Sequence, residues 1–206
     1  MKLLLLGATG STGRQIVDLA LERGHHVSAF VRSPDKVERR DSRLTVVGSP
    51  LREDALVDAL RGHDAVLSTL GLPPRLALRP STFMTESVTT TTNAMTRASV
   101  SRLVILSAAV LFPGSGLGYA FFSWMLKHHA RDLRAMEDVV EHTSLSWTIA
   151  RPPRLRAADD ARYAEKSGAL PTGSSTATYR AVASFMLDAA ERSLYEKQIV
   201  GLVTPS

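Results

Sequence analysis

The chain contains 206 residues, of which 44% are apolar and 22% are charged, and its formal net charge is +5. This length suits one ordinary domain, and the composition excludes a wholly disordered chain. Because cysteine is absent, a disulfide framework, a thiolate metal site and a cysteine nucleophile are excluded, and no apolar stretch approaches the roughly 18 residues of a membrane helix.

The chain alternates between short apolar runs and segments with helical periodicity. Residues 3–6 form a continuous apolar run, which is typical of a strand buried on both faces. Segment 11–23 has apolar residues at helical spacing, and Gly24 follows where a helix C-terminal glycine belongs. The threonine run 89–92 has weak helix propensity, so packing must stabilise a helix there. Further strands are expected at 26–31, 44–47, 65–70, 103–106, 146–150 and 198–203. Further helices are expected at 52–60, 81–99, 119–142 and 179–191.

This alternation predicts an α/β fold with a doubly wound parallel sheet. Strands that alternate with helices form a parallel sheet covered on both faces, and the crossovers are right-handed. No linker divides the chain, so residues 1–206 are expected to form one domain. Segments 112–118 and 153–175 break the alternation after the carboxyl ends of strands, where open α/β sheets bind their ligands. We therefore expect regions 108–130 and 153–178 to form the substrate side of that domain.

A glycine-rich turn, Gly-Ala-Thr-Gly-Ser-Thr-Gly at 7–13, joins the first strand to the first helix. In such a turn one glycine permits the tight bend, another lets the backbone approach a pyrophosphate, and a third allows close helix–sheet packing. Free N–H groups and the helix dipole then stabilise phosphate charge. The alternative is a plain strand–turn–helix junction whose glycines serve geometry alone. We favour a nucleotide site, and its candidate contacts in this loop are Gly7, Thr9, Gly10, Ser11, Thr12 and Gly13.

The G-x-x-G-x-x-G spacing resembles the loop of the extended and atypical short-chain dehydrogenase/reductase families. Segments 31–34, 70–71 and 107–108 are similar to the ends of the second, fourth and fifth strands in those families. Segment 147–155 is similar to the sixth-strand signature of the NAD(P)H-binding atypical members, and the whole chain most resembles their biliverdin/flavin reductase group. The resemblance implies a Rossmann-like NAD(P)-binding fold and a reductase activity. It also implies further cofactor contacts at Leu70, Gly71, Ser107 and Pro152.

Arg32 indicates which nicotinamide cofactor the chain prefers. It stands nineteen residues after Gly13, where an NAD-preferring enzyme has an acid that accepts hydrogen bonds from the ribose 2′-OH. An arginine can instead pair with a 2′-phosphate, and Ser33 and Arg14 can add donors. NADP(H) is therefore favoured over NAD(H). The alternative for Arg32 is a solvent-exposed side chain that binds no ligand. The resembled group often has Gly-Asp after the third strand, whereas this chain has Ser49 in place of the acid near the adenine.

Ordinary short-chain dehydrogenases use a Tyr-x-x-x-Lys pair, and no tyrosine of this chain has a lysine four residues later. Ser107 matches the family's active-site serine, which can hydrogen-bond an acceptor or the nicotinamide amide. The alternative is a strand-end serine that satisfies local backbone groups. Arg154 stands where flavin-reductase-like members have a histidine; it can bind an anionic acceptor but cannot act as a general acid. Ser107 and Arg154 are the catalytic candidates.

The charged residues predict neither a metal site nor a nucleic-acid site. His128 and Asp132 share a helical face, but no third ligand accompanies them, so we expect a solvated face there that includes Glu137. No metal is predicted. The basic residues are scattered along the chain, so nucleic acid is not an expected partner.

Two functions remain open. One is an NADP(H)-dependent oxidoreductase that transfers a hydride to a small conjugated or anionic acceptor, such as a flavin, quinone, tetrapyrrole or ketone. The other is a non-catalytic NADP(H)-binding redox sensor, which the missing Tyr-x-x-x-Lys pair allows. The absence of cysteine suits a reducing compartment, and we expect a cytoplasmic protein with a small-molecule partner. The sequence predicts no oligomeric state.

Overall fold

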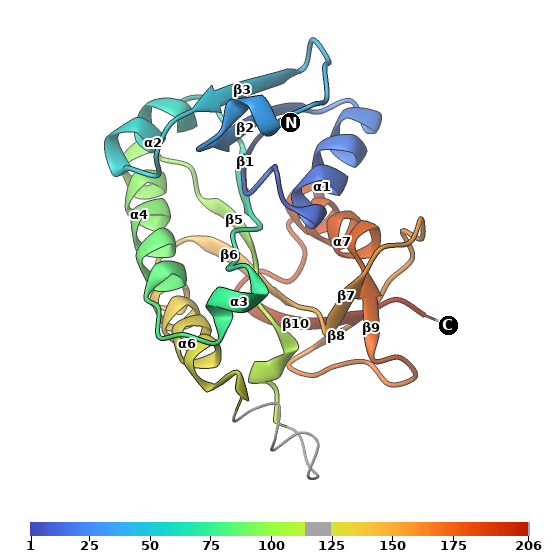
Figure 1. The fold of residues 1–206 in the computed structure, drawn as a ribbon. Coiled ribbons are helices and arrows are strands. Elements are labelled where there is room, and N and C mark those ends of the chain that lie inside the picture. Colours follow the sequence, from blue (N-terminus) through green and yellow to red (C-terminus); the bar gives the residue numbers. More distant parts are fainter. Residues whose placement is uncertain (114–124, 206) are drawn as a thin grey trace.

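The computed structural model describes residues 1–113 and 125–205 as three layers, with a central sheet between two groups of helices (Figure 1). The strands of this sheet are β1 Lys2–Leu6, β2 His26–Val31, β3 Leu44–Gly48, β4 Ala65–Ser68, β5 Arg102–Leu106, β6 Ser146–Arg151, β8 Ala164–Ser167 and β10 Gln198–Val203. Their order is β3-β2-β1-β4-β5-β6-β10-β8, and neighbours pair in parallel except at the edge, where β8 runs antiparallel to β10. The predicted α/β class with a doubly wound sheet is confirmed.

Helices cover both faces of the sheet. The main helices are α1 Ser11–Glu22, α2 Glu53–Leu60, α4 Phe83–Ala98, α6 Lys127–Glu141 and α7 Tyr179–Arg192. Helices α1 and α7 pack side by side on one face, and α2, α4 and α6 cover the other (Figure 1). Short helical turns lie in the connections that follow β2, β4 and β5. They are η1 Pro34–Lys36, α3 Pro74–Ala77 and η2 Ala109–Leu111.

The first strand shows why its residues form a central strand. Leu3 and Leu5 are buried in the core beneath α1 and α7, whereas Leu4 and Leu6 are buried in the core on the opposite face. Successive side chains of a strand point to opposite faces, so a strand covered on both sides needs an uninterrupted apolar run. The predicted burial of residues 3–6 on both faces is confirmed.

Helix α4 forms despite its threonine run. Thr89, Thr90 and Thr91 each donate the side-chain hydroxyl to the backbone carbonyl four residues earlier, at 2.7–2.9 Å. Thr91 and Thr92 are buried, and α4 packs between α2 and α6. Tertiary packing therefore outweighs the weak helix propensity of threonine at this position.

The region after β6 departs from the predicted pattern. It contains β8 and also β7 (Arg154–Arg156), which pairs in parallel with β9 (Thr176–Thr178) in a second, two-stranded sheet. The predicted parallel sheet has one antiparallel strand, β8, which pairs with β10 at the edge. Residues 152–163, all of them described, contain no crossover helix. Without such a crossover the chain that returns after β6 runs antiparallel to it, and β10, which follows α7, lies between β6 and β8 and is parallel to β6.

Two further boundaries differ from the expectation. The predicted strand 65–70 ends at Ser68, so Leu70 and Gly71 lie in the loop that follows. The predicted helix 119–142 corresponds to α6, which spans Lys127–Glu141 with Leu126 as its N-cap; residues 119–124 of the prediction lie outside the described part of the chain. The same holds for most of segment 112–118 and for part of region 108–130. No helix within the described ranges is long and apolar enough to cross a membrane.

Candidate functional site

The glycines of the loop at residues 7–13 have distinct structural roles. Gly7 has a φ of +86°, and a Cβ there would lie 2.8 Å from the Thr69 carbonyl. A Cβ on Gly13 would lie 2.1 Å from the Gly7 carbonyl oxygen, so close packing of α1 against β1 requires glycine. A Cβ on Gly10 would meet a single described atom within 4 Å, that same oxygen, at 3.3 Å. The fold therefore needs Gly7 and Gly13, whereas Gly10 leaves its backbone open to a ligand.

The first turn of α1 can accept an anion. Gly10 is the N-cap, no described side chain caps the helix, and the first turn contains no acidic residue. The Gly10 N–H donates to the Gly7 carbonyl at 3.0 Å. The N–H groups of Ser11, Thr12 and Gly13 have no intrahelical acceptor, as in the first turn of any helix. These groups and the helix dipole together favour a bound phosphate.

A cleft of about 200 Å³ opens at the carboxyl ends of β1, β2 and β4. The parallel pairing of these strands brings three segments that are distant in sequence to one edge of the sheet. Six of the predicted cofactor contacts line this cleft: Gly7, Thr9, Gly10, Arg32, Leu70 and Gly71. The structure thus places them together, and their contact with a cofactor stays a prediction.

The cleft also contains residues that the sequence reasoning did not select as contacts. Thr69 donates its hydroxyl to the carbonyls of Leu6 and Gly7, at 3.2 and 3.3 Å, which ties the loop to the end of β4. Phe30 precedes Arg32 by two residues, so the period of a strand could have identified it. Phe83 begins α4, and no local signal connects it to the loop. The additional lining residues are Leu6, Phe30, Ser49, Leu51, Thr69 and Phe83.

Basic side chains gather beyond the end of β2. Arg32 is exposed and lines the cleft. Arg14 and Lys36 line a separate hollow of about 310 Å³, where Arg14 lies 3.6 Å from the carboxylate of Glu38. Ser33 lines neither space; its carbonyl accepts the N–H of Lys36, the last residue of η1. The structure therefore places Arg32 and Arg14 beside the loop and leaves Ser33 out of both linings.

The catalytic candidates lie away from this lining. Ser107 follows β5 and is 8% exposed; its N–H donates to the Ala150 carbonyl at 2.8 Å, and its Oγ has no hydrogen-bond partner in the described part of the chain. Pro152 is buried, and its carbonyl accepts the N–H of Ala109 at 2.9 Å. Arg154 is exposed on β7. None of the three proposed contacts, Ser107, Pro152 or Arg154, lines the cleft, and their roles stay predictions.

The expectation of a solvated face on α6 is wrong. Asp132 and Glu137 are buried, at 3% and 2% exposure. Asp132 accepts the backbone N–H groups of Met84 and Thr85 at the start of α4, both at 3.0 Å. Glu137 accepts two N–H groups from Arg151. Tertiary partners therefore cover these acids. Across residues 1–113 and 125–205, no group of three or more potential ligands could hold a metal ion.

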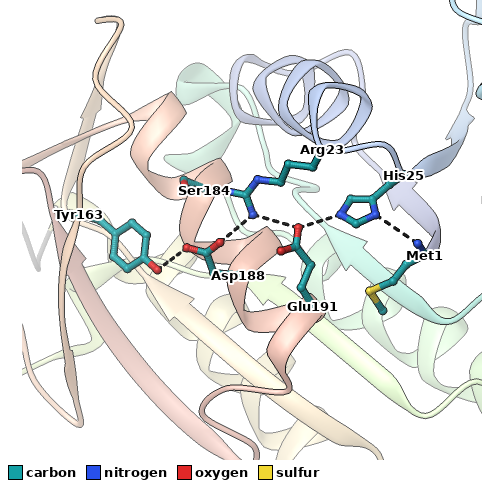
Figure 2. A network of polar contacts seen from close by, with 7 residues as sticks. All are labelled: Met1, Arg23, His25, Tyr163, Ser184, Asp188 and Glu191. Atoms are coloured by element: carbon teal, nitrogen blue, oxygen red, sulfur yellow. Dashed lines mark hydrogen bonds and ion pairs between the residues drawn. The ribbon is translucent and has the colours of Figure 1, made fainter.

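A polar network joins α1 to α7 on the face of the sheet opposite α6 (Figure 2). Arg23 donates to Asp188 at 2.7 Å and to Glu191 at 2.9 Å, and Glu191 also contacts His25 at 2.8 Å. Tyr163 donates its hydroxyl to Asp188 at 2.6 Å. Burial, together with the Asp188 carboxylate, raises the pKa of the Tyr163 hydroxyl well above its usual range. Tyr163 is therefore a structural donor and is poorly suited to proton transfer near neutral pH.

The parallel sheet, the glycine loop and the cleft at the strand ends define a nucleotide-binding protein of the Rossmann class. The family model described as NAD(P)H-binding matches residues 7–193, which is most of the chain. The chain therefore belongs to the NAD(P)H-binding family, and its cofactor class is a nicotinamide dinucleotide.

Similar proteins support the same fold. The oxidoreductase stcQ of Emericella nidulans is 34% identical over 175 residues, which are 73% of this chain and 64% of that protein. The chain spans less than two thirds of the length of the first curated relatives it matches. A short-chain dehydrogenase/reductase of Veillonella parvula, solved in complex with NADP, has a TM-score of 0.78 at 17% identity, covering 100% of this chain and 95% of that one. A Streptococcus pneumoniae protein provisionally labelled an NADH-flavin reductase has a TM-score of 0.78 at 22% identity, covering 99% of both chains.

Proposed function

We propose that this chain is an NADP(H)-dependent reductase of the atypical short-chain dehydrogenase/reductase type, most similar to the biliverdin/flavin reductase group. The observation that carries the proposal is the cleft that joins the glycine loop to Arg32. Among its described lining residues none is acidic, so no carboxylate there opposes a 2′-phosphate. The open backbone at Gly10 and the free N–H groups of α1 fit a pyrophosphate.

The chain offers residues for each part of the cofactor. The N–H groups at the start of α1 suit the pyrophosphate, and the guanidinium groups of Arg32 and Arg14 suit a 2′-phosphate. Phe30 and Leu51 supply apolar surface in the same cleft. Leu70 and Gly71, which follow β4, are proposed to contact the nicotinamide half.

A bound reduced nicotinamide supplies a hydride to an acceptor. Ser107 is proposed to hydrogen-bond the acceptor or the nicotinamide amide, because its Oγ has no partner among the described residues. Arg154, which is exposed, is proposed to attract the negative charge of an acceptor. Hydride transfer to a flavin or quinone depends on stacking and positioning, so a Tyr-x-x-x-Lys pair is not required.

The test has two stages. Fluorescence titration with NADPH and NADH measures cofactor binding, and NADPH oxidation with a panel of flavins, quinones, tetrapyrroles and ketones then identifies the acceptor class. Binding of NADPH without oxidation by any acceptor would contradict the reductase and support the second candidate below. Failure to bind either dinucleotide would contradict the cofactor assignment itself.

The second candidate is a non-catalytic sensor of the NADP(H) pool. The observation that favours it is the absence of the Tyr-x-x-x-Lys pair from the sequence, together with the engagement of Tyr163 by Asp188. A sensor would bind NADPH and NADP⁺ with different affinities and transmit that difference to a partner. Either function suits the cytoplasmic location and the small-molecule partner that we propose, and neither requires nucleic acid.

A further inference from the structure

A buried ion pair joins α6 to the end of β6 outside the proposed cofactor contacts. Arg151 donates its Nε–H to one carboxylate oxygen of Glu137 at 2.9 Å and a second N–H to the other oxygen. The two residues are 8% and 2% exposed. Two parallel hydrogen bonds between planar groups fix the orientation of both side chains.

Arg151 stands where the segment after β5 is attached to β6. The carbonyl before it, from Ala150, accepts the Ser107 N–H at 2.8 Å, and the carbonyl after it, from Pro152, accepts the first N–H of η2 at 2.9 Å. The Arg151 guanidinium also lies 4.7 Å from the centroid of the Phe112 ring, just beyond η2. The Arg151 side chain therefore links α6 and the end of β6 to Phe112 beyond η2, while the backbone on either side of Arg151 holds Ser107 and η2.

Stability alone does not account for charges at this position. Burying two charges is costly, and apolar residues of similar volume often stabilise a fold as well as a buried ion pair does. The pair offers directional geometry that apolar contacts lack. That geometry matters here because the neighbouring Ser107 is itself buried, with an Oγ that has no partner in the described ranges.

We propose that Arg151 and Glu137, with Phe112 over the guanidinium, are positioning residues that hold Ser107 and η2 in place for the nicotinamide half of the cofactor. The proposal rests on the proposed function, because Ser107 is expected to face the nicotinamide or its acceptor. The pair acts through the ends of β5 and β6 and needs no contact with the cofactor. The adenosine half is expected at the glycine loop and Arg32, and its binding should not depend on the Arg151–Glu137 pair.

The test compares a whole dinucleotide with its adenosine half. The double variant Arg151→Met/Glu137→Leu removes the pair without leaving an unpaired buried charge, so we expect it to fold. Titrations with NADPH and with 2′,5′-ADP, which lacks the nicotinamide, give two dissociation constants. We expect the Kd of 2′,5′-ADP to stay within about twofold of wild type and that of NADPH to rise about fivefold or more, the size of one lost hydrogen bond. Amide hydrogen exchange across residues 107–112 should become faster.

Two further variants keep the result interpretable. Arg151→Lys retains the charge but loses the bidentate geometry and most of the stacking, so we expect a smaller shift in the same direction. Glu191→Gln is the matched control, because it weakens the ion-pair network between α1 and α7 on the other face of the sheet (Figure 2). It should lower the melting temperature and leave the ratio of the two dissociation constants unchanged.

The outcomes separate this proposal from the proposed function. If the Arg151 variants keep both wild-type dissociation constants, the pair merely stabilises the fold and the proposal is overturned. Equal weakening of both ligands overturns it as well, since that result indicates general loosening. If wild-type protein binds no nicotinamide dinucleotide, the proposed function fails first, and the positioning role falls with it.

Discussion

Replacing Arg32 with aspartate perturbs the basic side of the proposed cofactor cleft. The side chain is exposed where it lines the cleft, so its removal leaves no cavity in the core. A hydrogen bond to a charged group contributes about 1.5–3 kcal/mol, and about 1.4 kcal/mol is a factor of ten in Kd. Loss of an arginine–phosphate pair should therefore weaken NADPH roughly ten- to a hundredfold. Aspartate adds repulsion toward the 2′-phosphate, whereas NADH has no phosphate at that position and should lose much less.

The assay is a fluorescence titration of wild type and Arg32→Asp with NADPH and with NADH, repeated at two salt concentrations. Arg61→Asp is the control: it makes the same charge change at an exposed position after α2, where Arg61 pairs with Asp58. It should leave both affinities close to wild type. Equal losses of NADPH and NADH affinity in Arg32→Asp would refute a role in binding the 2′-phosphate. So would a loss of the same size in the control.

Three other changes test separate parts of the argument. Gly10→Val should abolish dinucleotide binding in a protein with wild-type circular dichroism, because the backbone conformation at Gly10 suits any residue while the branched side chain covers the loop; unchanged NADPH affinity would contradict the loop assignment. Ser107→Ala should reduce turnover roughly ten- to a thousandfold and NADPH binding much less, and Arg154→Ala should raise KM for an anionic acceptor with little change in kcat; wild-type values of both constants for both variants would show that the site is misplaced. Burial lowers the pKa of His129, although the charge of Asp132 acts in the opposite direction. The folded protein therefore favours the neutral ring, and the stability that this contributes is present at a pH above the ordinary histidine pKa and is lost as the pH falls. His129→Gln should therefore show a smaller drop in urea midpoint between pH 7 and pH 5 than wild type, and an equal drop would contradict this origin.

The sequence by itself determined the features that depend on neighbouring residues. The leucine run at 3–6 predicts burial on both faces, because side chains alternate along any strand. A Cβ on Gly13 would meet the backbone of Gly7 and Ala8 in the same loop, so glycine is required there by residues close in sequence. For the same reason the positions of most strands and helices follow from local pattern. The loop residues and Arg32 are identified from a motif and its spacing, whereas Leu70 and Gly71 are implied by the family resemblance.

Only the tertiary structure decided which polar residues are buried and which strand ends share a cleft. Asp132 and Glu137 have the local pattern of an exposed helix face, yet both are covered because their partners arrive from α4 and β6. Asp132 lies 48 residues from Met84, and no helical periodicity encodes such a contact. Phe83 enters the cleft in the same way, and β8 is antiparallel because of the path by which the chain returns. A buried carboxylate is stable only beside a hydrogen-bond donor or a cation, and those groups reach Asp132 and Glu137 only in the folded chain.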